Sequence, residues 1–127
     1  TIEAITAEIV GAFLKNFDMR RERCWIAEID GETVGSVFLV RDSDEVARIR
    51  LLIVDAKARG LGIGRDLVER ALAFAREAGY SKITLWTHAD LTAARAIYES
   101  LGFRRTRQWV HEDFGKPLDS ETWDLLL

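Results

Sequence analysis

Apolar residues near the start of the chain recur at steps of three and four positions. They are Ile2, Ile5, Ile9, Phe13 and Phe17, with Val10 and Leu14 beside them. This spacing places the side chains on one stripe of an α-helix, as in an amphipathic helix that covers a core. The pattern therefore predicts a helix over residues 2–17.

Three β-prone segments come next. Residues 24–29 and 33–40 are joined at Asp30-Gly31, a dipeptide typical of a tight hairpin turn. After a polar break at residues 42–44, residues 46–54 resume the β pattern and end in an apolar run. We expect three antiparallel strands in succession after the first helix.

The second half of the chain alternates between helix and strand. The expected elements are a helix after the glycines at 60, 62 and 64 that ends at Gly79, a strand over 82–87, a helix with Thr92 as its N-cap that ends at Gly102, and strands over 103–110 and 121–127. The order α-β-β-β-α-β-α-β-β predicts an α/β fold with one mixed sheet and helices packed on it. A right-handed crossover makes the strands 46–54 and 82–87 parallel neighbours.

The loop between those two strands carries candidate binding chemistry. It reads Arg59-Gly60-Leu61-Gly62-Ile63-Gly64-Arg65 and stands where a helix begins. Glycines at alternate positions let backbone N–H groups converge, and a helix N-terminus attracts anions, so a pyrophosphate is the expected occupant. A glycine-rich connection that binds nothing is the alternative. The spacing fits neither the dinucleotide fingerprint nor the phosphate loop of ATPases.

Two motifs resemble the GCN5-related N-acetyltransferases, the GNAT family. Residues 59–64 are similar to the family's Q/R-x-x-G-x-G/A signature, and residues 94–103 are similar to its A-x-x-x-Y-E-x-x-G-F segment. The resemblance implies a GNAT-like fold whose two parallel strands splay to hold acetyl-CoA. It also implies a cofactor site. The residues implied for that site are Leu52, Ile53, Val54, Arg59, Gly60, Leu61, Gly62, Ile63, Gly64, Arg65, Ala94 and Tyr98.

The chain departs from the family pattern in two places. No clear strand precedes the first helix, so the N-terminal strand of the fold is expected to be missing. Leu91 stands where the family often has an asparagine that contacts pantetheine. The chain also resembles the acetyltransferase half of bacterial MarR–GNAT fusion proteins. That resemblance would explain a chain that opens with Thr1, as a piece of a longer protein.

Catalytic roles follow from the resemblance and from ordinary acid–base chemistry. The resemblance implies that Tyr98 is the general acid near the CoA sulfur; the alternative is an ordinary half-buried tyrosine. The strand before the glycine loop has arginines where many relatives have a glutamate base. Glu45 and Asp55 are expected to be surface charges, and Cys24 a small buried apolar residue.

Four residues are candidates for the acceptor side. Arg48 and Arg50 alternate along one strand and would suit an amine that carries a carboxylate; a solvated strand face is the alternative. His88 ends the strand after the phosphate helix, where a plain solvated histidine is the alternative. His111 closes a later strand and could wall the acceptor pocket.

Composition narrows the class of protein. The chain has 127 residues, a formal net charge of −3 and one cysteine, which predicts a single domain over 1–127 without a disulfide or a cysteine-rich metal site. We expect a cytoplasmic protein that binds neither nucleic acid directly nor a membrane, with a small-molecule or peptide amine as its partner. A homodimer is left open.

The expected reaction is acetyl transfer from acetyl-CoA to a primary amine by direct attack, because no cysteine with a base partner is visible. Two alternatives remain. The domain could sense acyl-CoA within a transcriptional regulator without turnover, or it could be an interaction domain whose glycine loop is structural.

Overall fold

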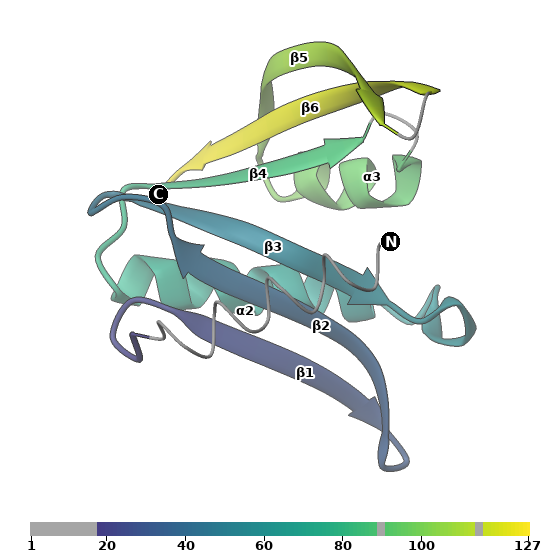
Figure 1. The fold of residues 1–127 in the computed structure, drawn as a ribbon. Coiled ribbons are helices and arrows are strands. Elements are labelled where there is room, and N and C mark those ends of the chain that lie inside the picture. Colours follow the sequence, from purple (N-terminus) through teal and green to yellow (C-terminus); the bar gives the residue numbers. More distant parts are fainter. Residues whose placement is uncertain (1–17, 89–90, 114–115) are drawn as a thin grey trace.

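A computed structural model describes residues 18–88, 91–113 and 116–127 (Figure 1). The helix predicted over residues 2–17 lies outside these described residues, as does the place of the N-terminal strand expected to be missing. Neither described helix is long and apolar enough to cross a membrane.

The described chain forms a six-stranded sheet in the order β1-β2-β3-β4-β6-β5. The strands are β1 (Arg23–Ile29), β2 (Glu32–Arg41), β3 (Val46–Val54), β4 (Lys82–His88), β5 (Arg104–Asp113) and β6 (Lys116–Leu126). Only β3 and β4 pair in parallel; the other neighbours are antiparallel. The predicted mixed sheet, with its parallel pair, is therefore confirmed.

The turn between β1 and β2 forms where the dipeptide indicated it. Asp30 and Gly31 both have positive φ angles, 51° and 78°. Such angles at both central residues make the two-residue turn whose twist matches antiparallel strands. The sequence signal thus located this hairpin to within a residue at each end.

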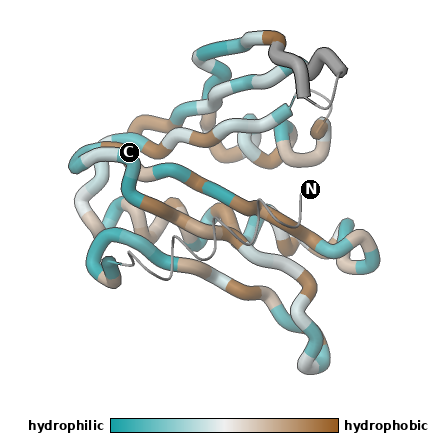
Figure 2. The backbone as a smooth tube through the Cα atoms, viewed as in Figure 1, coloured by the Kyte–Doolittle hydropathy of each residue, from teal (hydrophilic) through white to brown (hydrophobic). Residues whose placement is uncertain are grey.

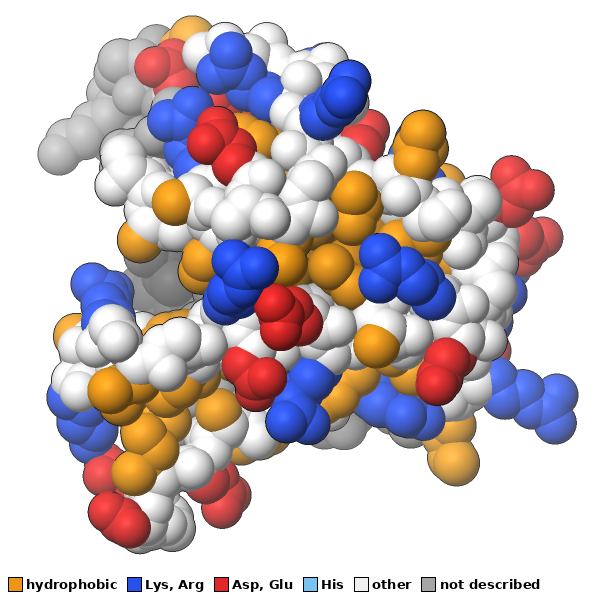
Figure 3. Space-filling model, turned by 180° about the vertical axis from the view of Figure 1, so that it is seen from behind, with side chains coloured by type: hydrophobic (Ala, Val, Ile, Leu, Met, Phe, Trp, Pro, Cys, Tyr) orange, Lys and Arg blue, Asp and Glu red, His pale blue; other side chains and the backbone are white. Residues whose placement is uncertain are grey.

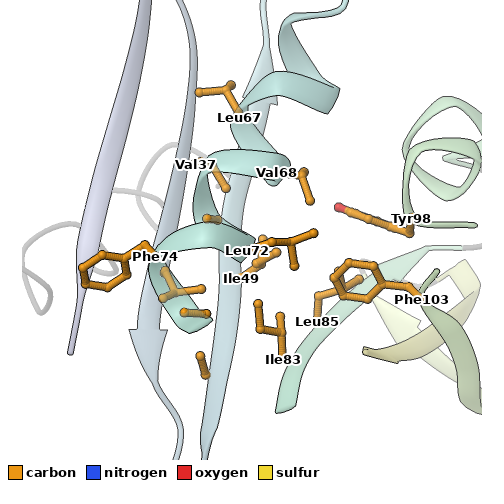
Figure 4. Packing of buried hydrophobic residues seen from close by; sticks show 14 of the residues in the cluster. Val37, Ile49, Leu67, Val68, Leu72, Phe74, Ile83, Leu85, Tyr98 and Phe103 are labelled. Carbon is orange, nitrogen blue, oxygen red and sulfur yellow. The ribbon is translucent and has the colours of Figure 1, made fainter. Parts of the chain in front are cut away.

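Two helices and a short 3₁₀ turn accompany the sheet: η1 (Ala56–Ala58), α2 (Ile63–Glu77) and α3 (Thr92–Ser100). In Figure 2 hydrophobic positions recur along α2 and along the strands it covers. Figure 4 shows Leu67, Val68 and Leu72 of α2 reaching toward Val37 of β2 and Ile49 of β3. Each such buried aliphatic side chain contributes about 1.5–3 kcal/mol through removal from water, which fixes α2 against β2 and β3.

Two expectations about element ends are corrected. Thr92 is the first residue of α3 and not its N-cap: Leu91 holds that position, because its carbonyl already accepts the hydrogen bond from Arg95 N at 3.1 Å. The last two strands are also longer than expected and meet in a hairpin through the pair Glu112 and Pro117. Proline is tolerated there because β6 begins to pair with β4 only at Ser120.

Gly35 of β2 lies where the sheet leaves no room for a side chain. A Cβ at this position would stand 3.0 Å from the carbonyl oxygen of Ile53 and 3.3 Å from side-chain atoms of Ile63 and Leu67. Gly35→Ala is therefore expected to lower the free energy of unfolding by about 1–3 kcal/mol through overpacking. Urea denaturation measures this loss, and an unchanged midpoint would contradict the close approach.

Candidate functional site

A cleft of about 830 Å³ opens between β3 and β4. Its walls come from five elements: β3 and β4, with further residues of α3, β5 and β6. The two parallel strands pair only at their beginnings, where Val46, Ala47 and Arg48 meet Lys82, Ile83 and Thr84. Beyond that point the strands diverge, and Figure 3 shows the molecule hollowed at one side. The splay that the family resemblance implied is confirmed.

A β-bulge deepens this opening from the β3 side. Gly35 and Ser36 of β2 pair with Val54 and Ile53, but Phe38 pairs with Arg50, so Leu51 and Leu52 together oppose one residue of β2. Leu51 has a φ of 52°, an unusual angle for a side chain of this size. Bulges re-aim a strand locally and are common beside active sites. In the far half of β3, backbone groups on the side of β4 therefore face the cleft, because β4 does not pair with them.

The glycine loop follows β3 and η1 and runs into the first turn of α2. Gly60 and Gly62 have φ angles of 83° and 77°, and Gly62 is the residue before the first turn of α2. No oxygen of the described residues accepts a hydrogen bond from the backbone N–H groups of residues 60–65. These donors stand at the positive end of the α2 dipole, so the loop is built to receive an anion.

The two arginines beside this loop differ in their surroundings. Arg59 is exposed and forms no ion pair with a described residue. Arg65 donates from Nε to Glu69 at 3.0 Å and from Nη1 to Ser100 Oγ at 2.8 Å. Arg59 is thus available to an anion, whereas Arg65 already connects α2 to the end of α3.

Tyr98 lines the cleft from α3 and is almost fully buried, with 4% of its surface exposed. Its ring packs on Phe103 and Trp123, at centroid distances of 5.6 and 6.4 Å. Figure 4 shows its oxygen pointing toward Val68 of α2. Burial raises the pKa of the Tyr98 hydroxyl to about 12. No described residue binds the hydroxyl, so its hydrogen-bonding capacity is left to a ligand.

Both predicted arginines of β3 line the cleft, but their charges are not equivalent. Arg48 donates from Nε and Nη2 to Asp42 Oδ1, at 3.2 and 3.0 Å, and stands 4.7 Å from the ring centre of Trp86. Arg50 is exposed, and its side chain has neither an ion pair nor a hydrogen bond with a described residue. The sequence reading, which treated them as a matched pair, missed this difference.

The predicted histidines also separate. His88 lines the cleft, and its Nδ1 stands 3.4 Å from the Oγ of Ser120 on β6. His111 belongs to β5, where its backbone faces Leu118 of β6, and its side chain lies outside the described residues. Cys24 is half-buried on β1, away from the cleft, and burial raises the pKa of its thiol. Among the residues described, no group of side chains could hold a metal ion.

Sequence reasoning missed a buried carboxylate behind the cleft. Glu121 of β6 is fully buried and is contacted by Arg95 of α3 at 2.9 Å, Arg105 of β5 at 3.1 Å and Trp123 Nε1 at 3.1 Å. Burial alone would raise the pKa of this carboxyl. Hydrogen bonds from Arg105 and Trp123, with the charges of Arg95 and Arg105, hold that pKa below its ordinary value. The cluster ties α3, and with it Tyr98, to the sheet.

The described residues fit acetyl-CoA as a ligand. The N–H groups of residues 60–65, which have no acceptor among the described residues, suit its phosphates. The end of β3, which does not pair with β4, suits the amides of its pantetheine arm. Ala94 and Leu91, beside Tyr98 in the cleft lining, supply apolar surface on the α3 side. Ile53 lines the cleft, and the chain then runs through η1 to Gly62 in the glycine loop.

Comparison with known proteins agrees with this geometry. Residues 4–103 match the Acetyltransferase (GNAT) family model. An N-acetylaspartate synthetase of Danio rerio is 39% identical over 94 residues, which are 73% of this chain and 33% of that protein. N-acetyltransferase 8B of Homo sapiens is 35% identical over 103 residues, 77% of this chain and 45% of that protein. The chain thus spans between a third and half the length of these curated relatives.

The fold comparison points the same way. A GNAT family acetyltransferase from Elizabethkingia anophelis, solved with acetyl-CoA bound, matches with a TM-score of 0.75 and 21% identity, over 94% of this chain and 82% of that one. Acetyl-CoA is thereby confirmed as a cofactor of the family. The relation to MarR–GNAT fusion proteins finds no support in these comparisons and stays a prediction. Because the family model spans most of its length, the chain belongs to the acetyltransferase (GNAT) family.

Proposed function

We propose that this chain transfers an acetyl group from acetyl-CoA to a primary amine by direct attack. One observation carries the proposal: the Tyr98 hydroxyl, which no described residue binds, lines a cleft whose β3 wall leads through η1 into a loop whose N–H groups have no acceptor among the described residues. Family membership supports the same reaction class. The relatives are longer than this chain, and their names supply no acceptor for it.

Each part of the site has a separate task in this proposal. Residues 60–65 and Arg59 bind the phosphates, and residues 52–54 bind the pantetheine amides. When bound, acetyl-CoA supplies an acetyl group activated as a thioester. Arg65 fixes α3 against α2 through its hydrogen bond to Ser100, and this contact holds the loop and Tyr98 in a fixed relative position.

Tyr98 serves as a hydrogen-bond donor more than as a full acid. Its pKa of about 12 keeps the proton on Oη at any physiological pH. Full transfer to a thiolate of pKa near ~8.5 would be uphill by about 5 kcal/mol. The hydroxyl therefore stabilises the negative charge of the leaving sulfur by donating a hydrogen bond and keeps its own proton, and the released thiolate takes a proton from solvent.

The acceptor amine must be neutral when it attacks. Within the described lining of the cleft no aspartate or glutamate is present, and His88 is the imidazole that an acceptor amine would meet there. Cys24 lies away from the cleft with a raised pKa, so an acetyl-cysteine intermediate has no support. Trapping a stably acetylated protein, seen by mass spectrometry, would overturn direct attack.

Tyr98→Phe is expected to lower kcat by about 10–100-fold while the affinity for acetyl-CoA stays nearly unchanged. Stability should hardly change, because the hydroxyl binds no described residue. Tyr80→Phe is the matched control: Tyr80 is equally buried but donates to the carbonyl of Arg21 at 2.6 Å, outside the cleft. It should cost about 1 kcal/mol of stability and leave kcat intact. Equal kcat losses in the two variants would remove Tyr98 from the mechanism.

A sensing domain without turnover is the second candidate. The absence of a carboxylate from the described cleft lining favours it, because such a site has fewer proton acceptors. Calorimetry with acetyl-CoA, followed by thiol release with a panel of amines, separates the two functions. Tight cofactor binding without thiol release from any amine would favour sensing. The cytoplasmic location and the homodimer stay predictions.

A further inference from the structure

We infer that the mouth of the cleft is an acceptor site for amines that carry a carboxylate next to a large apolar or aromatic group, the chemistry of an apolar amino acid. This inference rests on the proposed function and specifies its acceptor. Two features carry it: one uncompensated arginine, Arg50, and one exposed aromatic platform, Trp86.

Arg48 is not available to an acceptor. Its guanidinium is held by two hydrogen bonds to Asp42, stacks over Trp86, and leaves only 16% of its side chain exposed. A cation in this position is already neutralised by the carboxylate, so a second carboxylate gains little from approaching it. The structural task of Arg48 is to hold the ring of Trp86.

Arg50 is the cation that an acceptor meets. It lies on the same wall of the cleft and is exposed, and its guanidinium has no ion pair or hydrogen bond with any described residue. No described residue of the lining carries a negative charge to compensate it. A guanidinium offers a planar fork of donors that matches the two oxygens of a carboxylate.

Trp86 supplies the apolar surface. Its ring is held by Arg48 at 4.7 Å and by the edge of Trp109 at 6.0 Å, and Arg107 in turn stands 5.0 Å from the Trp109 ring. Despite these contacts, 63% of Trp86 remains exposed. A large aromatic side chain that is fixed in place yet exposed at a cleft is typical of a ligand-contact surface.

The same two features disfavour other acceptors. A polyamine would bring further positive charge beside Arg50, with no carboxylate in the described lining to receive it. An acceptor with two carboxylates, such as aspartate, would find only one uncompensated arginine in that lining and no use for the Trp86 surface. A single carboxylate with an apolar side chain uses both features.

The test compares acceptors that differ by one group. Thiol release from acetyl-CoA is measured with L-phenylalanine, phenethylamine, L-alanine, L-aspartate and spermidine. We expect kcat/KM to be at least tenfold higher for phenylalanine than for phenethylamine, which lacks the carboxylate. Arg50→Gln should remove that preference by lowering kcat/KM for phenylalanine at least tenfold while phenethylamine is unaffected. Trp86→Ala should lower kcat/KM for phenylalanine and leave alanine nearly unchanged.

Arg76→Gln, an exposed arginine on α2 outside the cleft, is the matched control and should change none of these values. A preference for spermidine or aspartate, or an equal effect of Arg50→Gln on both aromatic amines, would overturn the inference. Calorimetry with N-acetyl-L-phenylalanine keeps the test independent of turnover. Binding that weakens tenfold in Arg50→Gln without any thiol release would support the acceptor site and reject catalysis. No binding of this compound by the unaltered chain would reject the acceptor site.

Discussion

Gly62→Asp is expected to lower the affinity for acetyl-CoA by at least about 100-fold. The new carboxylate would stand among the N–H groups of residues 60–65, which have no acceptor among the described residues, and would accept hydrogen bonds from them itself. Each charge-assisted hydrogen bond lost to a phosphate costs about 1.5–3 kcal/mol, and the carboxylate adds charge repulsion. Calorimetric titration with acetyl-CoA measures the loss.

The chain offers a close control for this change. Gly31 has nearly the same backbone angle as Gly62, 78° against 77°, and a Cβ at either position meets no atom within 4 Å. Gly31→Asp therefore imposes the same backbone strain, at the β1–β2 turn instead of the loop. It should lower thermal stability about as much as Gly62→Asp and leave acetyl-CoA binding intact. If both variants bind equally well, the loop is a structural connection.

Much of the fold could be predicted because local signals and tertiary packing agree. The β-prone runs of β2 and β3, the turn at Asp30-Gly31 and the helical stripe of α2 each coincide with an observed element. The end of β5 and the start of β6 could not be placed, because their pairing depends on each other and not on a local apolar pattern. The N-cap of α3 was misassigned because Thr92 has the residue type of a cap but follows Leu91, whose carbonyl already accepts the first hydrogen bond of the helix.

The site could be predicted only where the role of a residue follows from its neighbours in the sequence. Glycines before a helix favour an anion loop when a second motif of the same family accompanies them, whereas arginines on a strand do not reveal their partners. Asp42 neutralises Arg48 across the β2–β3 turn, and this contact separates it from Arg50. Glu121 was not singled out from the sequence because its partners Arg95 and Arg105 come from other elements, α3 and β5, and meet it only in the folded sheet.

Glu121→Gln is expected to lower the free energy of unfolding by about 3 kcal/mol at neutral pH. The fully buried carboxylate is the anion for two guanidiniums, and removing one partner of a buried ion pair costs about 3–5 kcal/mol. The lower end of this range applies because the Arg105 side chain is 45% exposed, so water can hydrate its guanidinium once the carboxylate is gone. Thermal unfolding followed by circular dichroism should show a midpoint lower by roughly 10 °C. Glu69→Gln, which breaks an exposed pair with Arg65, is the control and should cost under about 1 kcal/mol.

The cost of Glu121→Gln should depend on pH in one direction only. Because the pKa of Glu121 is lower in the folded chain than its ordinary value of 4.5, the ionised carboxylate stabilises the fold fully above that ordinary value. This stabilisation is lost as the pH falls through the lowered pKa, since the unaltered chain then also carries a neutral side chain. The difference in unfolding free energy between the two proteins should be constant from pH 8 to about pH 6 and shrink below about pH 4. A difference that grows on acidification would mean that the folded site prefers a protonated Glu121, which the contacts of Arg95 and Arg105 contradict.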